Sequence, residues 1–149
     1  MIQAFVMVGP PGSGKTTYSR KLTKEHRAAF LSGDDIRDEL YGDASIQGSW
    51  DEIWSRMDEL VAENCHRCIV VDGTHCRPDY RAETLTLLRS YGYTDIHAIV
   101  VDRPLAVCLQ QNRQRSRQVP EHVIKQMHEE LASSKQGIGN EGFSSVLYV

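Results

Sequence analysis

The sequence lacks three features that would place it in other classes of protein. None of its apolar runs approaches the ~20 residues that a helix needs to cross a membrane, so a membrane protein is not expected. Residues 1–8 carry no charged leader before their apolar stretch, which favours a buried strand over a signal peptide. Basic residues are outnumbered by acidic ones, 17 against 20, so we expect no broad basic surface, which leaves room only for a local basic patch.

Cysteine is also scarce, with four residues at positions 65, 68, 76 and 108. Cys65 and Cys68 have the spacing of half a zinc site, and histidines lie nearby, but the sequence has no second such pair. Buried or half-buried thiols are therefore the better interpretation. Without an export signal, reduced thiols and a cytoplasmic location are expected.

What the sequence does contain is an alternation of short apolar runs with helical patterns. With 149 residues, 40% of them hydrophobic and 25% charged, residues 1–149 fit one globular domain. No internal repeat or low-complexity segment interrupts it. Strands that alternate with helices predict an α/β fold, with a central parallel sheet covered on both faces. The strands are expected at 2–8, 28–32, 68–72, 96–102 and 146–149, and the helices at 15–26, 35–41, 50–64, 78–91, 104–117 and from 120 onward.

Two of these segments carry specific expectations. Residues 50–64 place six apolar side chains at helical spacing, which predicts an amphipathic helix whose apolar face packs on the core. Residues 137–142 are rich in glycine and are interpreted as a linker before the last strand. The six apolar side chains are Trp50, Ile53, Trp54, Met57, Leu60 and Val61.

The first motif is GPPGSGKT at residues 9–16, which matches G-x-x-x-x-G-K-[ST] between a strand and a helix. Glycines let the backbone wrap closely, so that its N–H groups and the start of the helix can point at phosphate oxygens. Lys15 would reach the β- and γ-phosphates, and the Thr16 hydroxyl would ligate Mg²⁺. A chance glycine turn is a poor alternative in this context. The predicted ATP-binding residues of the loop are Gly9, Gly12, Ser13, Gly14, Lys15, Thr16 and Thr17.

A second motif, SGDDIR, follows the second expected strand. Open α/β sheets bind ligands at the carboxyl edge, where Asp34 could accept a proton from an attacking hydroxyl. Arg37 lies three residues later, so on a helix it faces the same way and could bind an anion beside that hydroxyl. The alternative is an aspartate that caps a helix, with a solvated arginine.

A third acidic position ends the strand CIVVD. Asp72 is placed where P-loop enzymes orient a magnesium-bound water, although a capping aspartate is the alternative. Thr74 follows it in the same segment. Arg81, a few residues further on, is either a surface residue or a contact to the acceptor.

Three arginines precede Pro120 in QQNRQRSRQVP, which we expect to continue the helix that begins at Pro104. Solvated, they would form an exposed basic face. The functional interpretation is a lid whose guanidinium groups neutralise charge on a transferring phosphoryl group. The three are Arg113, Arg115 and Arg117.

The segments GPPGSGKTT, SGDDIR, VVDGTH and RQRSRQVPEHVI together resemble the P-loop kinases related to the 5′-kinase domain of phage and bacterial polynucleotide kinases. The resemblance covers nearly the whole chain. It implies a P-loop NTPase of the kinase-like class, a three-layer sandwich with a central parallel sheet and a helical lid. It also implies ATP and Mg²⁺ as cofactors.

By this resemblance Asp34 is the general base and Arg37 holds the phosphate 3′ to the reacting hydroxyl. Arg115 aligns with the lid arginine, which makes it a catalytic residue with Lys15 and Asp34, while Arg113 and Arg117 would bind ATP. Thr74 and Arg81 would contact the acceptor, and Asp72 would hold the metal through water. The family more often has asparagine at the position of His75, and often has another arginine at the position of Gln111.

The expected function is therefore an ATP-dependent polynucleotide 5′-hydroxyl kinase, with the 5′-OH end of DNA or RNA as its substrate and no obligate protein partner. A small-molecule kinase acting on a sugar, a nucleoside or an antibiotic is the nearest alternative, and a nucleotide-binding ATPase without an acceptor is a more distant one. Arg37 argues against a neutral acceptor, because an arginine beside the base favours an anion. Asp34 argues against the ATPase, which needs no base at this strand.

Overall fold

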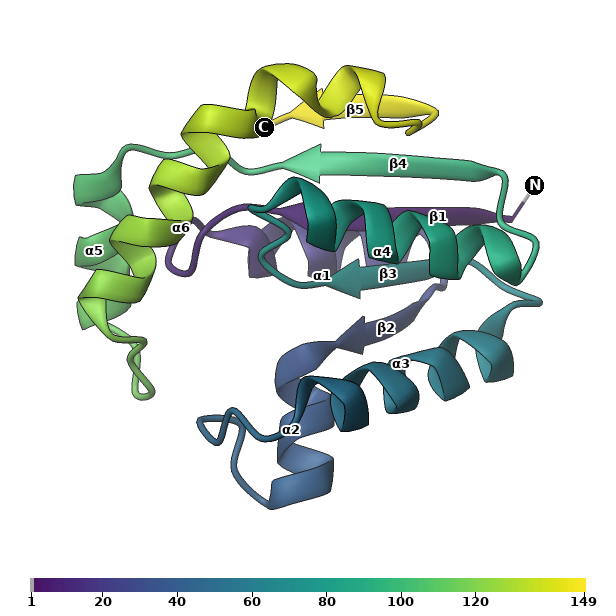
Figure 1. The fold of residues 1–149 in the computed structure, drawn as a ribbon, viewed down its shortest axis with the longest axis horizontal. Helices are drawn as coiled ribbons and strands as arrows, with labels where there is room; N and C mark the ends of the chain where they lie inside the picture. The colour runs from purple at the N-terminus through teal and green to yellow at the C-terminus, as the bar shows by residue number, and fades with distance from the viewer. Residues whose placement is uncertain (1) are drawn as a thin grey trace.

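The computed structural model describes residues 2–149 and shows a five-stranded parallel sheet with helices on both faces (Figure 1). The strand order is β2-β3-β1-β4-β5, and every neighbouring pair is parallel. This confirms the predicted α/β fold with a central parallel sheet. The strands are β1 (Gln3–Val8), β2 (Ala29–Ser32), β3 (Ile69–Asp72), β4 (Asp95–Val100) and β5 (Ser145–Tyr148).

The helices connect the strands in sequence order, so that the carboxyl ends of all five strands lie at one edge of the sheet (Figure 1). Two helices, α1 and α3, begin and end at the predicted residues. The helices are α1 (Lys15–His26), α2 (Gly33–Tyr41), α3 (Trp50–Asn64), α4 (Pro78–Ser90), α5 (Leu105–Arg113) and α6 (Glu121–Ser134), followed by the 3₁₀ helix η1 (Lys135–Asn140).

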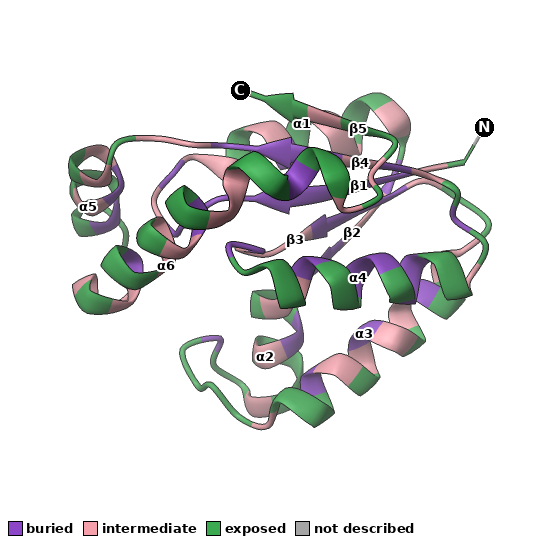
Figure 2. Cartoon of the chain, turned by 45° about the horizontal axis from the view of Figure 1, so that its top comes forward, coloured by how far each residue is buried: buried purple, intermediate pink, exposed green. Residues whose placement is uncertain are grey.

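Side chains of β1 alternate between the two halves of the core. Phe5 and Met7 belong to a small cluster that Tyr18 and Leu22 of α1 complete. Ala4, Val6 and Val8 belong instead to the larger cluster, which includes residues of α2, α3, α4 and α6. Because successive side chains of a strand point to opposite faces, α1 covers one face, and α2, α3, α4 and α6 cover the second. Figure 2 shows the central strands as mostly buried, while the edge strand β5 and the outer surfaces of the helices are largely exposed.

Two expectations about the C-terminal third are wrong. Helix α5 ends at Arg113, so Arg115 and Arg117 lie in the connection to α6. The buried Asn112 stabilises that connection, because its side-chain amide donates to the Val119 carbonyl and accepts from the Val119 N–H, both at 2.9 Å. The supposed glycine-rich linker is mostly the 3₁₀ helix η1, which buries Ile138 in the core.

Within residues 2–149, no helix combines the length and apolarity that crossing a membrane requires. The same described residues contain no cluster of three or more histidine, cysteine or acidic side chains that could hold a metal ion. All four cysteines are free thiols. The half zinc site suggested by the spacing of Cys65 and Cys68 is therefore not completed in this part of the chain.

Candidate active site

The loop between β1 and α1 approaches α5 so closely that it requires glycine. Gly12 has φ +80°, and a Cβ there would lie 2.3 Å from the Cys108 carbonyl oxygen. Gly14, the residue before α1, has φ +92°, a left-handed conformation that only glycine adopts without strain. The N-terminus of α1 therefore opens directly onto the loop, in the arrangement that places backbone N–H groups around an anion.

Lys15 and Asp72 form the charged centre beside this loop. The Lys15 ammonium group donates to the Pro10 carbonyl at 3.0 Å. Burial lowers the pKa of Lys15, and the nearby Asp72 carboxylate opposes that shift. Burial in turn raises the pKa of Asp72, while Lys15 opposes it. Oδ1 of Asp72 is buried without a hydrogen-bond partner, so one carboxylate oxygen is left for a ligand.

The end of β3 is fixed against the start of the loop by backbone and histidine contacts. The Gly9 N–H donates to the Thr74 carbonyl at 2.8 Å. Burial lowers the pKa of His75 to about 4, so its ring is neutral near pH 7. Nδ1 then donates to the Met7 carbonyl at 2.8 Å, and Nε2 accepts from the Thr84 hydroxyl at 2.9 Å. His75 thus holds the segment that carries Asp72 and Thr74.

Asp34 and Arg37 come together on α2, at the carboxyl end of β2, as the sequence predicted. Ser32 caps α2 by accepting from the Asp35 N–H at 3.0 Å, so Asp34 is not the capping residue. The Asp34 carboxylate is largely exposed and lies 3.5 Å from Nη1 of Arg37. The Arg37 side chain is 18% exposed, yet its Nε is buried without a partner.

Lys15, Asp34, Arg37 and Asp72 line one cavity of about 890 Å³. One wall runs from the loop past α2 to α3 and the start of α4, and the opposite wall comes from α5, α6 and their connection. The cavity brings together nine of the residues predicted from the sequence: Gly12, Gly14, Lys15, Thr16, Asp34, Arg37, Asp72, Thr74 and Arg115.

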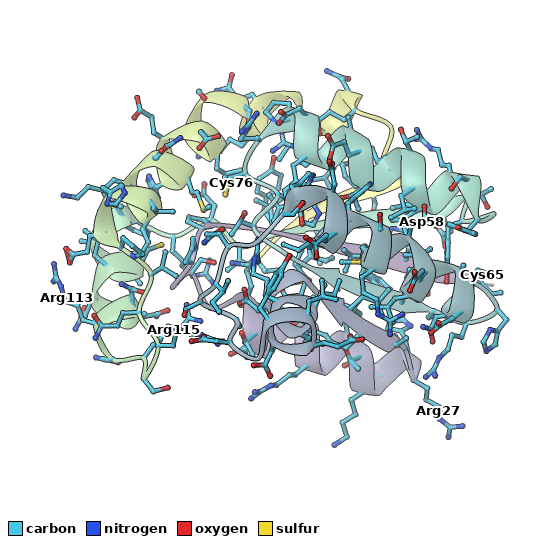
Figure 3. The ribbon with its side chains drawn as sticks, turned by 60° about the horizontal axis from the view of Figure 1, so that its bottom comes forward. Arg27, Asp58, Cys65, Cys76, Arg113 and Arg115 are labelled. Carbon is cyan, nitrogen blue, oxygen red and sulfur yellow. The ribbon has the colours of Figure 1, made fainter. Side chains whose placement is uncertain are left out.

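Five of the predicted ATP-binding residues do not line the cavity. Gly9 and Ser13 are buried residues of the loop, and Thr17 is exposed on α1. Arg113 forms an ion pair with Glu121 at 2.7 Å, and Arg117 is exposed. Figure 3 shows Arg113 at the outer edge of the molecule and Arg115 closer to its centre. Of the three arginines, Arg115 therefore has the position expected of a lid residue.

The expectation that Arg81 contacts an acceptor is wrong. Its side chain is fully buried, and Nε and Nη2 donate to the Glu141 carboxylate at 2.7 and 2.8 Å. Nη1 donates to the His75 carbonyl at 2.9 Å, and Nη2 also reaches Ser134 Oγ at 3.2 Å. Every nitrogen of the guanidinium group is thus used within the protein. Arg81 ties the loop after β3 to the C-terminal segment.

We expect Arg81→Met to lower the free energy of unfolding by about 3 kcal/mol, because removing one partner of a buried ion pair leaves the other unpaired. Urea denaturation measures this. Lys21→Met, which removes an exposed pair with Glu25, should leave the midpoint almost unchanged. Equal midpoints for the two variants would contradict the structural role of Arg81.

Sequence reasoning missed the aromatic part of the cavity. Trp50 and Trp54 were expected on the core, but both line the cavity, together with Tyr80 of α4. Of the two tryptophans, Trp54 alone also packs partly against the core. On α3 the buried positions are Ile53, Met57 and Val61. The apolar periodicity predicts the helix but cannot separate the side that faces the core from a side that faces a cavity.

The sheet, the glycine loop and the lysine define a P-loop NTPase domain of the kinase-like class, a fold that implies binding of a nucleotide with a metal. The chain belongs to the AAA domain family, whose sequence profile matches residues 5–133. No curated protein sequence matches it significantly.

Several solved structures share the fold at low sequence identity. A chain of the Pnkp1/Rnl/Hen1 RNA repair complex superposes with a TM-score of 0.80 at 20% identity, covering 92% of this chain and 46% of that one. A gluconokinase from Sinorhizobium meliloti gives 0.64 at 17% identity, with 99% and 81% covered. Shikimate kinase from Acinetobacter baumannii gives 0.59 at 19% identity, with 100% and 84% covered. The present chain thus spans less than half the length of the first of these.

Proposed function

We propose that this protein is an ATP-dependent kinase that transfers the γ-phosphoryl group to the 5′-hydroxyl end of DNA or RNA. The observation that carries the proposal is the shared cavity. Asp34 and Arg37 line it on one side, and Lys15 and the loop line it next to them. Phosphoryl transfer to an alcohol that carries a phosphate requires three groups: a base, an anion-binding arginine and a phosphate-binding loop.

Asp34 is the proposed general base. It accepts the proton of the 5′-hydroxyl while the hydroxyl oxygen forms a bond to the γ-phosphorus. The bond from that phosphorus to the β–γ bridging oxygen breaks, and ADP leaves with the bond's electron pair. Lys15 and Arg115 neutralise the charge that spreads over the transferring group. Both side chains line the same cavity, which supports this role.

The residues present also fit a magnesium ion. Thr16 lines the cavity at the start of α1, and Asp72 offers its unpartnered buried oxygen. We propose that Thr16 ligates the ion directly and Asp72 through water. Magnesium held there would supply positive charge beside the phosphates of the nucleotide and so reduce their negative charge.

The choice of acceptor depends on Arg37. The structural likenesses include both an RNA repair complex and small-molecule kinases, and at these identities they support the fold alone. The Arg37 Nε, buried and without a partner three residues from the base, is an unused donor suited to a phosphate oxygen. A 5′-terminal nucleotide carries such a phosphate on its 3′ side, whereas a neutral sugar does not.

A panel of acceptors with γ-labelled ATP tests the proposal. We expect label on 5′-hydroxyl oligonucleotides, and none on gluconate, shikimate or free sugars. Label on a small alcohol but not on any oligonucleotide would support the small-molecule alternative instead. ATP hydrolysis without any labelled acceptor would favour the ATPase.

We expect Arg37→Ala to raise the KM of a nucleoside 3′-phosphate by about 10-fold or more, because it removes a charge-assisted hydrogen bond to phosphate. The KM of the nucleoside without phosphate should change much less. Steady-state kinetics on the two acceptors measures the difference. Arg56→Ala is the matched control, since Arg56 pairs with acidic residues on α2 and α3 away from the cavity. An equal loss for both acceptors would contradict a phosphate contact.

A further inference from the structure

Three aromatic side chains form one continuous wall of the cavity, next to Asp34 and Arg37. The rings of Trp50 and Trp54 stack with centroids 5.4 Å apart and an interplanar angle of 21°. The Tyr80 ring lies nearly perpendicular to that of Trp50, with centroids 5.3 Å apart, and it also stacks on the buried His75 at 4.0 Å. We call Trp50, Trp54 and Tyr80 the aromatic wall.

Packing of α3 against the sheet does not account for this wall. Ile53, Met57 and Val61 supply the buried side of the helix, each with 2% or less of its surface exposed. Trp50 is 41% exposed although its ring is large and apolar. Leaving such a surface in water is unfavourable, and a cluster of aromatic rings inside a cavity marks a binding surface more often than single exposed rings do.

The first turn of α3 holds Trp50 in place before any ligand arrives. Ser49 caps the helix by accepting from the Glu52 N–H, and its own N–H donates to the Tyr41 hydroxyl at 3.0 Å. Gly48 packs so closely on the Tyr41 ring that a Cβ there would lie 2.1 Å from it. These contacts connect the start of α3, which carries Trp50, to the end of α2, the helix that carries Asp34 and Arg37.

Three chemical features therefore face one acceptor: a proton-accepting carboxylate, an unpartnered arginine nitrogen and flat aromatic rings. A molecule that matches all three has a hydroxyl, a phosphate and a planar π system. We propose that the aromatic wall is a stacking site for the nucleobase of the nucleotide that carries the reacting 5′-hydroxyl. This inference rests on the proposed kinase function and adds the recognition of the terminal base to it.

Intrinsic tryptophan fluorescence reports on the aromatic wall alone, because Trp50 and Trp54 are the only tryptophans of the sequence. A 5′-hydroxyl trinucleotide, added without ATP, should quench the intrinsic tryptophan fluorescence as a base stacks on the indole rings. The same trinucleotide with an abasic 5′-terminal residue should quench it much less.

Kinetics gives the second measurement. Stacking of one base on aromatic side chains corresponds to about a 10- to 100-fold preference, so wild-type protein should phosphorylate the intact trinucleotide with a kcat/KM higher by that factor than the abasic one. Trp50→Leu should remove most of this preference, and Trp50→Phe should keep part of it. Leu40→Ala, which changes a 39% exposed apolar side chain on α2 outside the cavity, should retain the full preference.

The possible outcomes separate the inference from the function on which it rests. Equal kcat/KM values for intact and abasic acceptors, with both phosphorylated by the wild-type protein, would overturn the stacking site and leave the kinase proposal standing. If no oligonucleotide accepts the phosphoryl group, and a sugar both quenches the fluorescence and accepts the group, the stacking site and the proposed polynucleotide kinase function are both overturned. A preference that Trp50→Leu removes and Leu40→Ala keeps would support the stacking site.

Discussion

Replacing Lys15 with alanine should lower kcat for phosphoryl transfer by about 10³-fold, because preorganised charge at the transferring group is among the largest contributions to such catalysis. The Pro10 carbonyl already holds the Lys15 ammonium group at the loop. Burial lowers the pKa of Lys15, and the nearby Asp72 carboxylate opposes that shift. Transfer of label from γ-labelled ATP to a 5′-hydroxyl oligonucleotide measures the loss.

Lys21→Ala is the control for this variant, since Lys21 lies on the same helix with 71% of its side chain exposed. It should react at the wild-type rate. Wild-type turnover by Lys15→Ala would show that the loop does not hold the transferring phosphoryl group.

Replacing Asp34 with asparagine should lower kcat by about 10²- to 10⁴-fold, the usual contribution of general base catalysis, and change ATP affinity by less than about threefold. Asparagine keeps the size of the side chain but cannot accept the proton. Because Ser32 caps α2, loss of the Asp34 charge should leave the helix intact. Parallel measurements of kcat and of ATP binding by calorimetry separate the two effects.

Asp35→Asn is a matched control, because Asp35 is the next residue of α2 and does not line the cavity. It should retain most of the activity. A fall in ATP affinity as large as the fall in kcat for Asp34→Asn would assign Asp34 a structural role instead. So would equal losses in the two variants.

Much of the fold could be predicted because its signals are local. Helix α3 begins after Ser49, whose hydroxyl caps it, and its apolar spacing continues to the last turn. The loop at residues 9–16 combines glycines, lysine and threonine in a pattern whose structural consequences are known for each residue type. The positions of Asp34 and Asp72 follow from a general property of parallel sheets, whose carboxyl ends share one edge.

The errors concern contacts that the local sequence pattern does not predict. Arg81 is paired with Glu141, 60 positions away, and no local sequence pattern predicts that partner. The end of α5 at Arg113 depends on Asn112, which turns inward to bind Val119. Trp50 and Ile53 both line the cavity, but Ile53 is buried and Trp50 is 41% exposed, a difference set by the packing of α3 against its neighbours.

The central claim is that Asp34 and the phosphate-binding loop act on the same phosphoryl group. A crystal structure with ADP, Mg²⁺, aluminium fluoride and a 5′-hydroxyl dinucleotide tests it most directly. The account predicts an Asp34 carboxylate oxygen about 2.6–3.2 Å from the 5′ oxygen, with that oxygen in line with the aluminium and Lys15 on the fluorides. A dinucleotide bound elsewhere, or an Asp34 side chain turned away from the 5′ oxygen, would contradict it.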